Sequence, residues 1–278
     1  IYTEFPEGLK LANMLKDMGE NGTGGVTLCI SSEIEGLGDS PLLEQRSALV
    51  GVEGRLGNFQ ITLEPDSKTN GGTQNRFSLV ADQLVVLTKA PPSGVKRRTG
   101  IHLLSSTESK ILEETATQVR ELVGHFHKPV HLTYDQDICA GGDKGIETCG
   151  HCISYCPYDA ISRQTENRLR IQVDHLTCEG CGACVSACPT SALQFTEPSP
   201  QEIYARMAAL LESSKEKQGN VEPPVIVFHC EEMGRKVLET AGEIPLPYSS
   251  GVLPVEVPCL RYVSESNMLA AFSLGAAG

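Results

Sequence analysis

The chain has 278 residues, which is enough for two or three folded domains. It is 40% hydrophobic, as is ordinary for a folded protein, and the absence of tryptophan predicts mostly aliphatic cores. Acidic residues outnumber basic ones 35 to 23 and give a net charge of −12, which argues against a nucleic-acid-binding protein because such proteins present a basic face. No apolar run approaches the ~20 residues of a membrane-spanning helix.

Residues 1–128 alternate between predicted strands and helices. We expect the end of a strand at Ile1–Tyr2, then a helix, and a second strand over Val26–Ile30. Apolar segments on either side of Gly54–Gly57 predict a hairpin. One further strand is predicted over Leu79–Leu87, and an amphipathic helix follows it. Because the chain begins as strand, helix, strand, a parallel sheet is favoured, and this part is expected to be an α/β, Rossmann-like scaffold.

The same order of elements is found in nucleotide-binding half-domains, but the phosphate-binding glycines are missing. A dinucleotide site needs Gly-x-Gly-x-x-Gly between the first strand and the first helix. Here that turn is Thr3–Gly8, where Pro6 opens the helix and Glu4 and Glu7 would repel phosphate. A flavin or nicotinamide site in this domain is therefore an alternative to a scaffold that docks to another protein.

Eight of the eleven cysteines lie in one stretch, from Cys139 to Pro189. Its second half, Cys178–Pro189, has the spacing C-x2-C-x2-C-x3-C-P, at which thiolates hold cubane iron–sulfur clusters. The first half ends in the same way, because Cys156–Ile161 and Cys188–Leu193 both read Cys-Pro, two residues, Ala and an aliphatic residue. This repeat predicts two copies of a cluster loop followed by a strand, in a pseudo-twofold module.

In two-cluster modules the fourth cysteine of each set ligates the other cluster. The sequence therefore predicts two [4Fe-4S] clusters with exchanged ligands. The first is assigned to Cys139, Cys149, Cys152 and Cys188, and the second to Cys178, Cys181, Cys184 and Cys156. Gly150, Gly180 and Gly182 are expected to let backbone N–H groups turn toward sulfur, which helps to set the potential.

The first set departs from the usual spacing, because nine residues separate Cys139 from Cys149. Either Cys139 reaches its cluster across this insertion, or that cluster is a three-iron or labile one. Zinc is the alternative metal, since four-cysteine zinc sites use paired C-x2-C knuckles, but three evenly spaced cysteines followed by Cys-Pro are rare in such sites. His151 is expected to face solvent or to lie near the ligands without being one.

The remaining chain predicts a helix and then a βαβα segment. A capping box, Ser199–Glu202, opens the helix. The βαβα elements are expected at 225–229, 231–241, 253–257 and 265–275. Cys29, Cys230 and Cys259 each lie at the C-terminal end of a predicted strand. They are interpreted as small buried apolar residues, with a metal site shared by Cys230 and Cys259 as the alternative.

Residues 139–189 resemble bacterial-type two-[4Fe-4S] ferredoxins. The whole chain resembles a family of multidomain 4Fe-4S binding proteins found with formate dehydrogenases. That resemblance rests on Phe5–Asn13, Gly124–Pro129, Asp137–Ala140, Arg206–Leu211, Ala270–Phe272 and Gly275–Gly278. The tail from Val255–Cys259 onward is similar to the iron–sulfur delta subunit of hydrogenase–heterodisulfide reductase complexes, although that subunit's extra paired cysteines are absent. These resemblances imply electron transfer to or from a molybdenum or nickel enzyme.

We interpret the chain as an electron-transfer protein or oxidoreductase subunit without a catalytic site of its own. An α+β two-[4Fe-4S] ferredoxin-like domain over 131–197 is expected between α/β segments at 1–128 and 198–278. Cluster thiols need a reducing compartment, which favours the cytoplasm, and the acidic surface suits a redox partner with a basic patch. The alternatives are a flavin- or nucleotide-binding subunit and an assembly factor. Both ends are expected to be cut from a longer protein.

Overall fold

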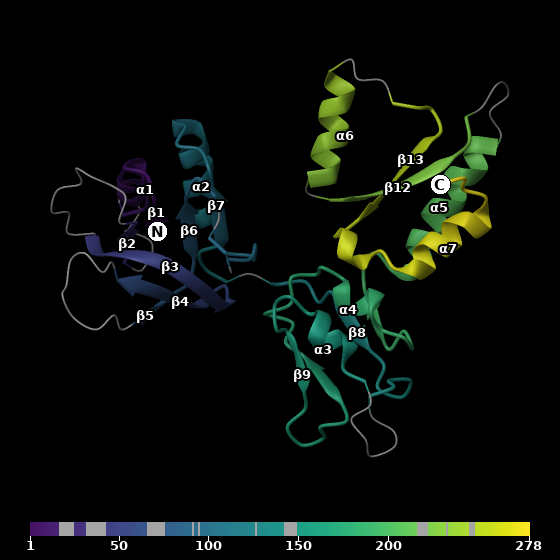
Figure 1. Cartoon of the computed structure of the whole chain (residues 1–278), viewed down its shortest axis with the longest axis horizontal. Coiled ribbons are helices and arrows are strands. Elements are labelled where there is room, and N and C mark those ends of the chain that lie inside the picture. The colour runs from purple at the N-terminus through teal and green to yellow at the C-terminus, as the bar shows by residue number, and fades with distance from the viewer. Residues whose placement is uncertain are drawn as a thin grey trace. The chain divides into compact units, whose positions relative to one another are not determined.

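A computed structural model describes residues 1–16, 25–31, 43–65, 76–90, 92–93, 95–125, 127–141, 149–215, 222–231, 233–244 and 248–278. The chain is mixed α/β and divides into two compact units, Ile1–His127 and Lys128–Gly278 (Figure 1). Within the described ranges, no helix combines the length and the apolar character that crossing a membrane requires.

In the first unit, the described residues form one sheet in the order β5-β4-β3-β2-β1-β6-β7. Its strands are β1 (Tyr2–Thr3), β2 (Leu28–Ile30), β3 (Leu43–Arg55), β4 (Asn58–Pro65), β5 (Phe77–Ala81), β6 (Leu84–Leu87) and β7 (Ile101–Leu104). From β7 through β6, β1 and β2 to β3 the pairing is parallel, and β3, β4 and β5 pair antiparallel. The predicted parallel beginning is therefore confirmed.

The central strand β6 is buried along its whole length, as expected for a parallel strand covered on both faces. Val85 and Leu87 pack against helices α1 (Glu7–Lys16) and α2 (Ser109–Glu121) on one face. Leu84 and Val86 belong to the core on the other face, which the side chains of β3 and β4 fill. This alternation follows from the two-residue period of a strand.

The hairpin predicted around Gly54–Gly57 is confirmed, and both glycines have the positive φ, 90° and 82°, that a tight turn favours. The prediction of a single strand over Leu79–Leu87 was wrong, because two separate strands, β5 and β6, occupy this range. The chain bends at Asp82, whose carbonyl accepts a hydrogen bond of 2.9 Å from the Gly57 N–H. β5 therefore pairs with β4, and β6 with β1.

The second unit contains three two-stranded pairings among its described residues: β8 with β11, β9 with β10, and β12 with β13. Its strands are β8 (Leu132–Tyr134), β9 (Ile161–Arg163), β10 (Ile171–Val173), β11 (Leu193–Phe195), β12 (Val225–Cys230) and β13 (Val252–Val257). Its helices are α3 (His151–Tyr155), α4 (Ala183–Ser186), α5 (Pro200–Lys215), α6 (Met233–Glu243), the 3-10 turn η2 (Leu260–Tyr262) and α7 (Glu265–Leu274). The predicted βαβα order is confirmed.

One hydrophobic core joins the cysteine-rich region to the C-terminal segment. Phe195 at the end of β11 packs edge-on against Tyr262 in η2, with ring centroids 5.6 Å apart. Ile203 and Met207 of α5 are fully buried in the same core. The capping box that opens α5 is confirmed, since Glu202 N–H donates to Ser199 Oγ at 3.2 Å and Ser199 N–H donates to the Glu202 carboxylate at 2.5 Å.

Helix α7 also begins with a capping box, in which Ser264 Oγ accepts from Asn267 N–H at 3.4 Å and Asn267 Oδ1 accepts from Ser264 N–H at 2.9 Å. Ser264→Ala is expected to destabilise this helix by about 1 kcal/mol. Hydrogen exchange of the α7 amides should accelerate about fivefold, because 1 kcal/mol changes an opening equilibrium by that factor. Ser273→Ala, at an exposed position of the same helix, should leave the rates unchanged, and equal effects of the two variants would contradict the assignment.

Candidate metal centre

The cysteine-rich region is built from two similar halves, and the first part of each is a strand, an aspartate turn and a cysteine. Asp135 follows β8 and Asp174 follows β10, each four residues before a cysteine. In both turns the Asp Oδ1 accepts from the N–H two residues on, at 2.9 Å in Asp137 and 3.0 Å in Leu176. Cys139 therefore occupies the position in the first half that Cys178 occupies in the second.

The second part of each half is a one-turn helix followed by a strand. Gly150 and Gly182 precede α3 and α4, and their carbonyls accept from Ser154 and Ser186 N–H groups, both at 3.1 Å. Asp159 and Ser191 then both adopt a φ of 57°. Cys156 and Cys188 end the two helical turns at equivalent points. The repeat predicted for Cys156–Ile161 and Cys188–Leu193, including the strand after each, is thus confirmed.

Strand pairing brings a cysteine of each half toward a cysteine of the other. β8 and β11 pair antiparallel with Tyr134 opposite Leu193, so Cys139, which follows β8, and Cys188, which precedes β11, lie at the same end of this ribbon. β10 and β9 pair in the same way, with Val173 opposite Ile161, and so bring Cys178 toward Cys156.

Four thiols of the second predicted set surround one pocket. Its lining contains Cys156, Cys178, Cys181 and Cys184. Apolar walls come from Leu132, Ala160 and Ile161, and Tyr158 lies at its edge. Burial, and then the neighbouring thiols of this set, raise the pKa of Cys184 to about 12.

The thiols of the first predicted set also lie close to one another. Burial, followed by the charges of Cys149, Cys188 and Cys139, raises the pKa of Cys152 to about 11. Cys152 in turn contributes to the raised pKa of Cys184, so the two groups of thiols are neighbours. Mutual repulsion of this kind opposes ionisation, whereas a bound cationic metal core stabilises thiolates outright.

Backbone N–H groups point at several of these sulfur atoms. Ala160 N–H donates to Cys156 Sγ at 3.3 Å. Burial raises the pKa of Cys188. Hydrogen bonds from the backbones of Leu193, Thr190 and Ala192 and from the Thr190 side chain lower it further than that, so the pKa lies below its ordinary value. The three glycines predicted to aid such contacts differ in backbone conformation, because Gly180 and Gly182 have positive φ, whereas the φ of Gly150 is −154°.

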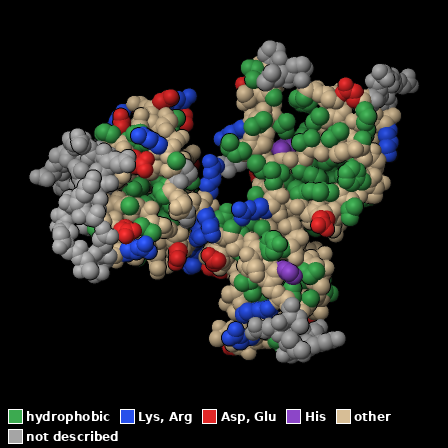
Figure 2. Space-filling model, in the orientation of Figure 1, with side chains coloured by type: hydrophobic (Ala, Val, Ile, Leu, Met, Phe, Trp, Pro, Cys, Tyr) green, Lys and Arg blue, Asp and Glu red, His purple; other side chains and the backbone are tan. Residues whose placement is uncertain are grey.

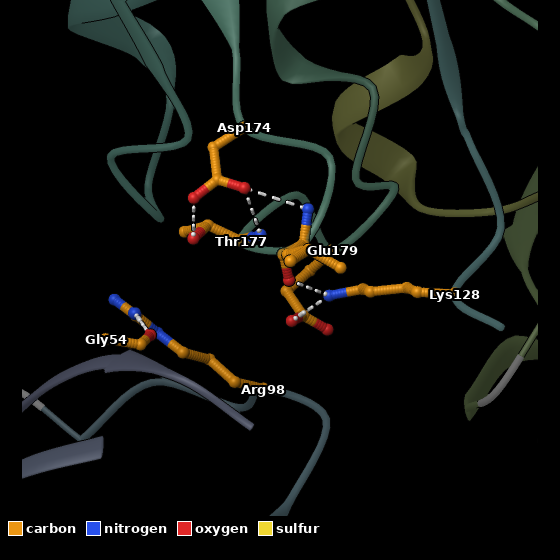
Figure 3. A network of polar contacts seen from close by, with 7 residues as sticks. Gly54, Arg98, Lys128, Asp174, Thr177 and Glu179 are labelled. Atoms are coloured by element: carbon orange, nitrogen blue, oxygen red, sulfur yellow. Dashed lines mark hydrogen bonds and ion pairs between the residues drawn. The ribbon is translucent and has the colours of Figure 1, made fainter. Parts of the chain in front are cut away.

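A nearly buried ion pair lies beside the second group. Lys128 Nζ donates to Glu179 Oε1 and to the Leu176 carbonyl, both at 2.8 Å, and the two charged side chains are 13% and 11% exposed (Figure 3). Figure 3 also shows the Asp174 carboxylate bonded to Thr177, next to this pair. The lysine neutralises the glutamate, so this pair adds little net charge at the second group.

The residues present fit thiolate-bound clusters. The hydroxyl of Tyr134 is buried, and the Cys139 thiol lies beside it. Burial, and then the Cys139 thiol, raise the pKa of Tyr134 to about 12, so the phenol keeps its proton. A buried O–H without an acceptor costs about 1–3 kcal/mol, and a Cys139 thiolate supplies the acceptor. Among the described side chains, no three Cys, His, Asp or Glu groups are placed to hold a single metal ion.

The three other cysteines have different surroundings. Cys29 is buried in the core of the first unit, and Cys230 Sγ accepts from Gly234 N–H at 3.3 Å. Cys259 lies close enough to Cys181 to contribute to its raised pKa, after the larger effect of burial. The sequence carried no signal for that proximity, which arises because η2 packs against α4. His151 is exposed.

Two comparisons with known families agree with this geometry. Residues 146–192 match the 4Fe-4S dicluster domain, which identifies an iron–sulfur domain of ferredoxin type. Residues 225–278 match the methyl-viologen-reducing hydrogenase, delta subunit. No curated protein sequence matches the chain. The chain thus combines an iron–sulfur domain with a segment similar to a hydrogenase subunit, and an iron–sulfur electron-transfer role follows from the pair.

Proposed function

We propose that this chain holds two [4Fe-4S] clusters and, with both bound, passes single electrons between a redox enzyme and an acceptor. The ligands of the first cluster are Cys139, Cys149, Cys152 and Cys188, and those of the second are Cys178, Cys181, Cys184 and Cys156. The repeat supports this proposal, because its strand pairing brings Cys139 toward Cys188 and Cys178 toward Cys156. In this proposal 131–197 is a ferredoxin-like domain, and 1–128 and 198–278 are the segments that flank it.

Four thiolate ligands at the first cluster, including Cys139, are supported by the equivalence of the two halves. The aspartate turn before Cys139 has the hydrogen bond of the turn before Cys178. The charge of Cys139 also acts on Cys152, so its sulfur lies within this group. These observations favour a four-iron cluster over the three-iron alternative.

The C-terminal segment supports a role in binding a partner. Large apolar side chains lie on the surface of α6 and α7, including Val237 at 63%, Leu269 at 68% and Phe272 at 55% exposure. Figure 2 shows apolar side chains on the surface over this part of the chain. Exposed apolar patches commonly mark protein interaction sites.

The matched delta-subunit family favours a hydrogenase-type partner. The formate dehydrogenase or related molybdenum enzyme that the sequence resemblance implies has no support from the matched families. Thiolate ligation favours a reducing compartment, and we therefore keep the cytoplasm as the proposed location.

Anaerobically purified protein should contain about eight iron atoms and a similar amount of sulfide per chain, as two cubane clusters require. Reduction should give two interacting signals in electron paramagnetic resonance. Zinc, or about four irons, would overturn the proposal. Reducing one sample with hydrogen and a hydrogenase, and another with formate and a formate dehydrogenase, compares the two partner classes, and faster reduction by formate would reverse the preference stated above.

A further inference from the structure

The two halves of the repeat differ at the residue that ends the first strand of each. Tyr134 ends β8, and the equivalent residue at the end of β10 is Val173. The Tyr134 hydroxyl is buried beside Cys139, and the Ile171 backbone also lies next to it. Valine has no polar side-chain atom, so Val173 has no corresponding donor for Cys178.

A second hydroxyl lies at the same group of thiols. Thr190 Oγ1 is 3.8 Å from Cys188 Sγ, within the range of a hydrogen bond to sulfur. The repeat has Tyr158 at the equivalent position of the other half, where it lines the pocket of the second group and lies near Cys181. Two of the four sulfur atoms of the first group therefore have a side-chain hydroxyl beside them.

The charged side chains around the two groups of thiols differ as well. Arg163 donates to the carbonyl of Cys149, and the equivalent residue in the other half is the apolar Phe195. Arg170 donates to the Gln136 carbonyl and lies near Tyr134. Near the second group, Glu179 offsets Lys128, which leaves the Arg261 side chain near Cys181. Asp135 and Asp137, which precede Cys139, offset positive charge at the first group, so the hydroxyls and not the charges distinguish the two groups.

We propose that the Tyr134 and Thr190 hydroxyls donate to the Cys139 and Cys188 sulfurs and raise the reduction potential of the first cluster above that of the second. Hydrogen bonds to ligand sulfur stabilise the extra negative charge of a reduced cluster. The inference rests on the proposed function, because it requires both clusters to be bound.

The test is a redox titration of the intact anaerobic protein, followed by electron paramagnetic resonance. Wild-type protein should titrate in two separate one-electron steps. Tyr134→Phe should move the higher-potential step to a more negative value, so that the ratio of reduced to oxidised cluster at a fixed potential falls about threefold, or roughly 30 mV for a one-electron couple. Thr190→Val should move the same step in the same direction. The lower-potential step should stay where it is in both variants.

Matched controls remove a tyrosine or threonine hydroxyl at positions that are not beside the sulfur atoms. Tyr204→Phe alters an exposed tyrosine on α5, and Thr133→Val alters an exposed threonine next to Tyr134. Both should leave the two steps unchanged. Iron content is measured first in every sample, because fewer than about eight irons in wild-type protein contradicts the proposed function itself. With full iron content, unchanged potentials in both hydroxyl variants, or a shift of the lower-potential step, would overturn the inference. If one variant fails to fold, the other decides.

Discussion

Cys184→Ala is expected to lower the iron content from about eight to about four atoms per chain, or to convert one cluster to a three-iron form. Cys184 lies in α4, is 6% exposed and lines the pocket of the second group. Alanine leaves three thiolates and no replacement ligand at that corner. Iron and sulfide analysis, with electron paramagnetic resonance of the reduced protein, measures the loss.

Cys29→Ala is the matched control, because Cys29 is also a buried cysteine but belongs to the core of the first unit. It should retain both clusters and the full iron content. Cys152 belongs to the first group. Cys152→Ala should therefore remove the electron paramagnetic resonance signal that Cys184→Ala retains. Iron loss in Cys29→Ala, or full retention in Cys184→Ala, contradicts the ligand assignment.

Local spacing made much of the candidate site predictable. A loop with C-x2-C spacing directs its thiols to one place whatever surrounds it, and the Cys-Pro repeat marked the two halves directly. The pairing of β8 with β11 was not visible in the sequence, because it joins segments about 60 residues apart by backbone hydrogen bonds alone. It is this pairing that brings Cys139 toward Cys188.

Contacts between side chains distant in sequence could not be predicted either. The range Leu79–Leu87 has the length of one strand, and only the different partners of β5 and β6 show that it is divided at Asp82 and Gln83. Tyr134 reads as an ordinary strand residue until its hydroxyl is seen beside Cys139. Similarly, Cys259 had no partner by spacing, and only the packing of η2 places it near Cys181.

The contact between η2 and the second cysteine loop depends on Gly182. This glycine has a φ of 71°, in the left-handed region that favours glycine. A Cβ here would lie 2.8 Å from Tyr262 Cβ and 3.0 Å from Tyr262 Cα. Because these atoms belong to or adjoin the backbone, a side-chain rotation does not relieve the overlap. Ser186 Oγ, which donates to the Arg261 carbonyl at 2.8 Å, fixes the same contact.

Gly182→Ala is therefore expected to destabilise the second unit by about 2–4 kcal/mol, through backbone strain and overpacking together. Anaerobic urea unfolding, followed by the visible absorbance of the bound clusters, measures the change. Gly242→Ala is the control in the same unit, because Gly242 lies in α6 with nothing within 4 Å of the added Cβ. That variant should be neutral or more stable by up to about 1 kcal/mol, since alanine favours a helix over glycine. Equal stabilities of the two variants would show that η2 does not pack closely on the cysteine loop, whereas a loss confined to Gly182→Ala links the C-terminal segment to the stability of the second cluster site.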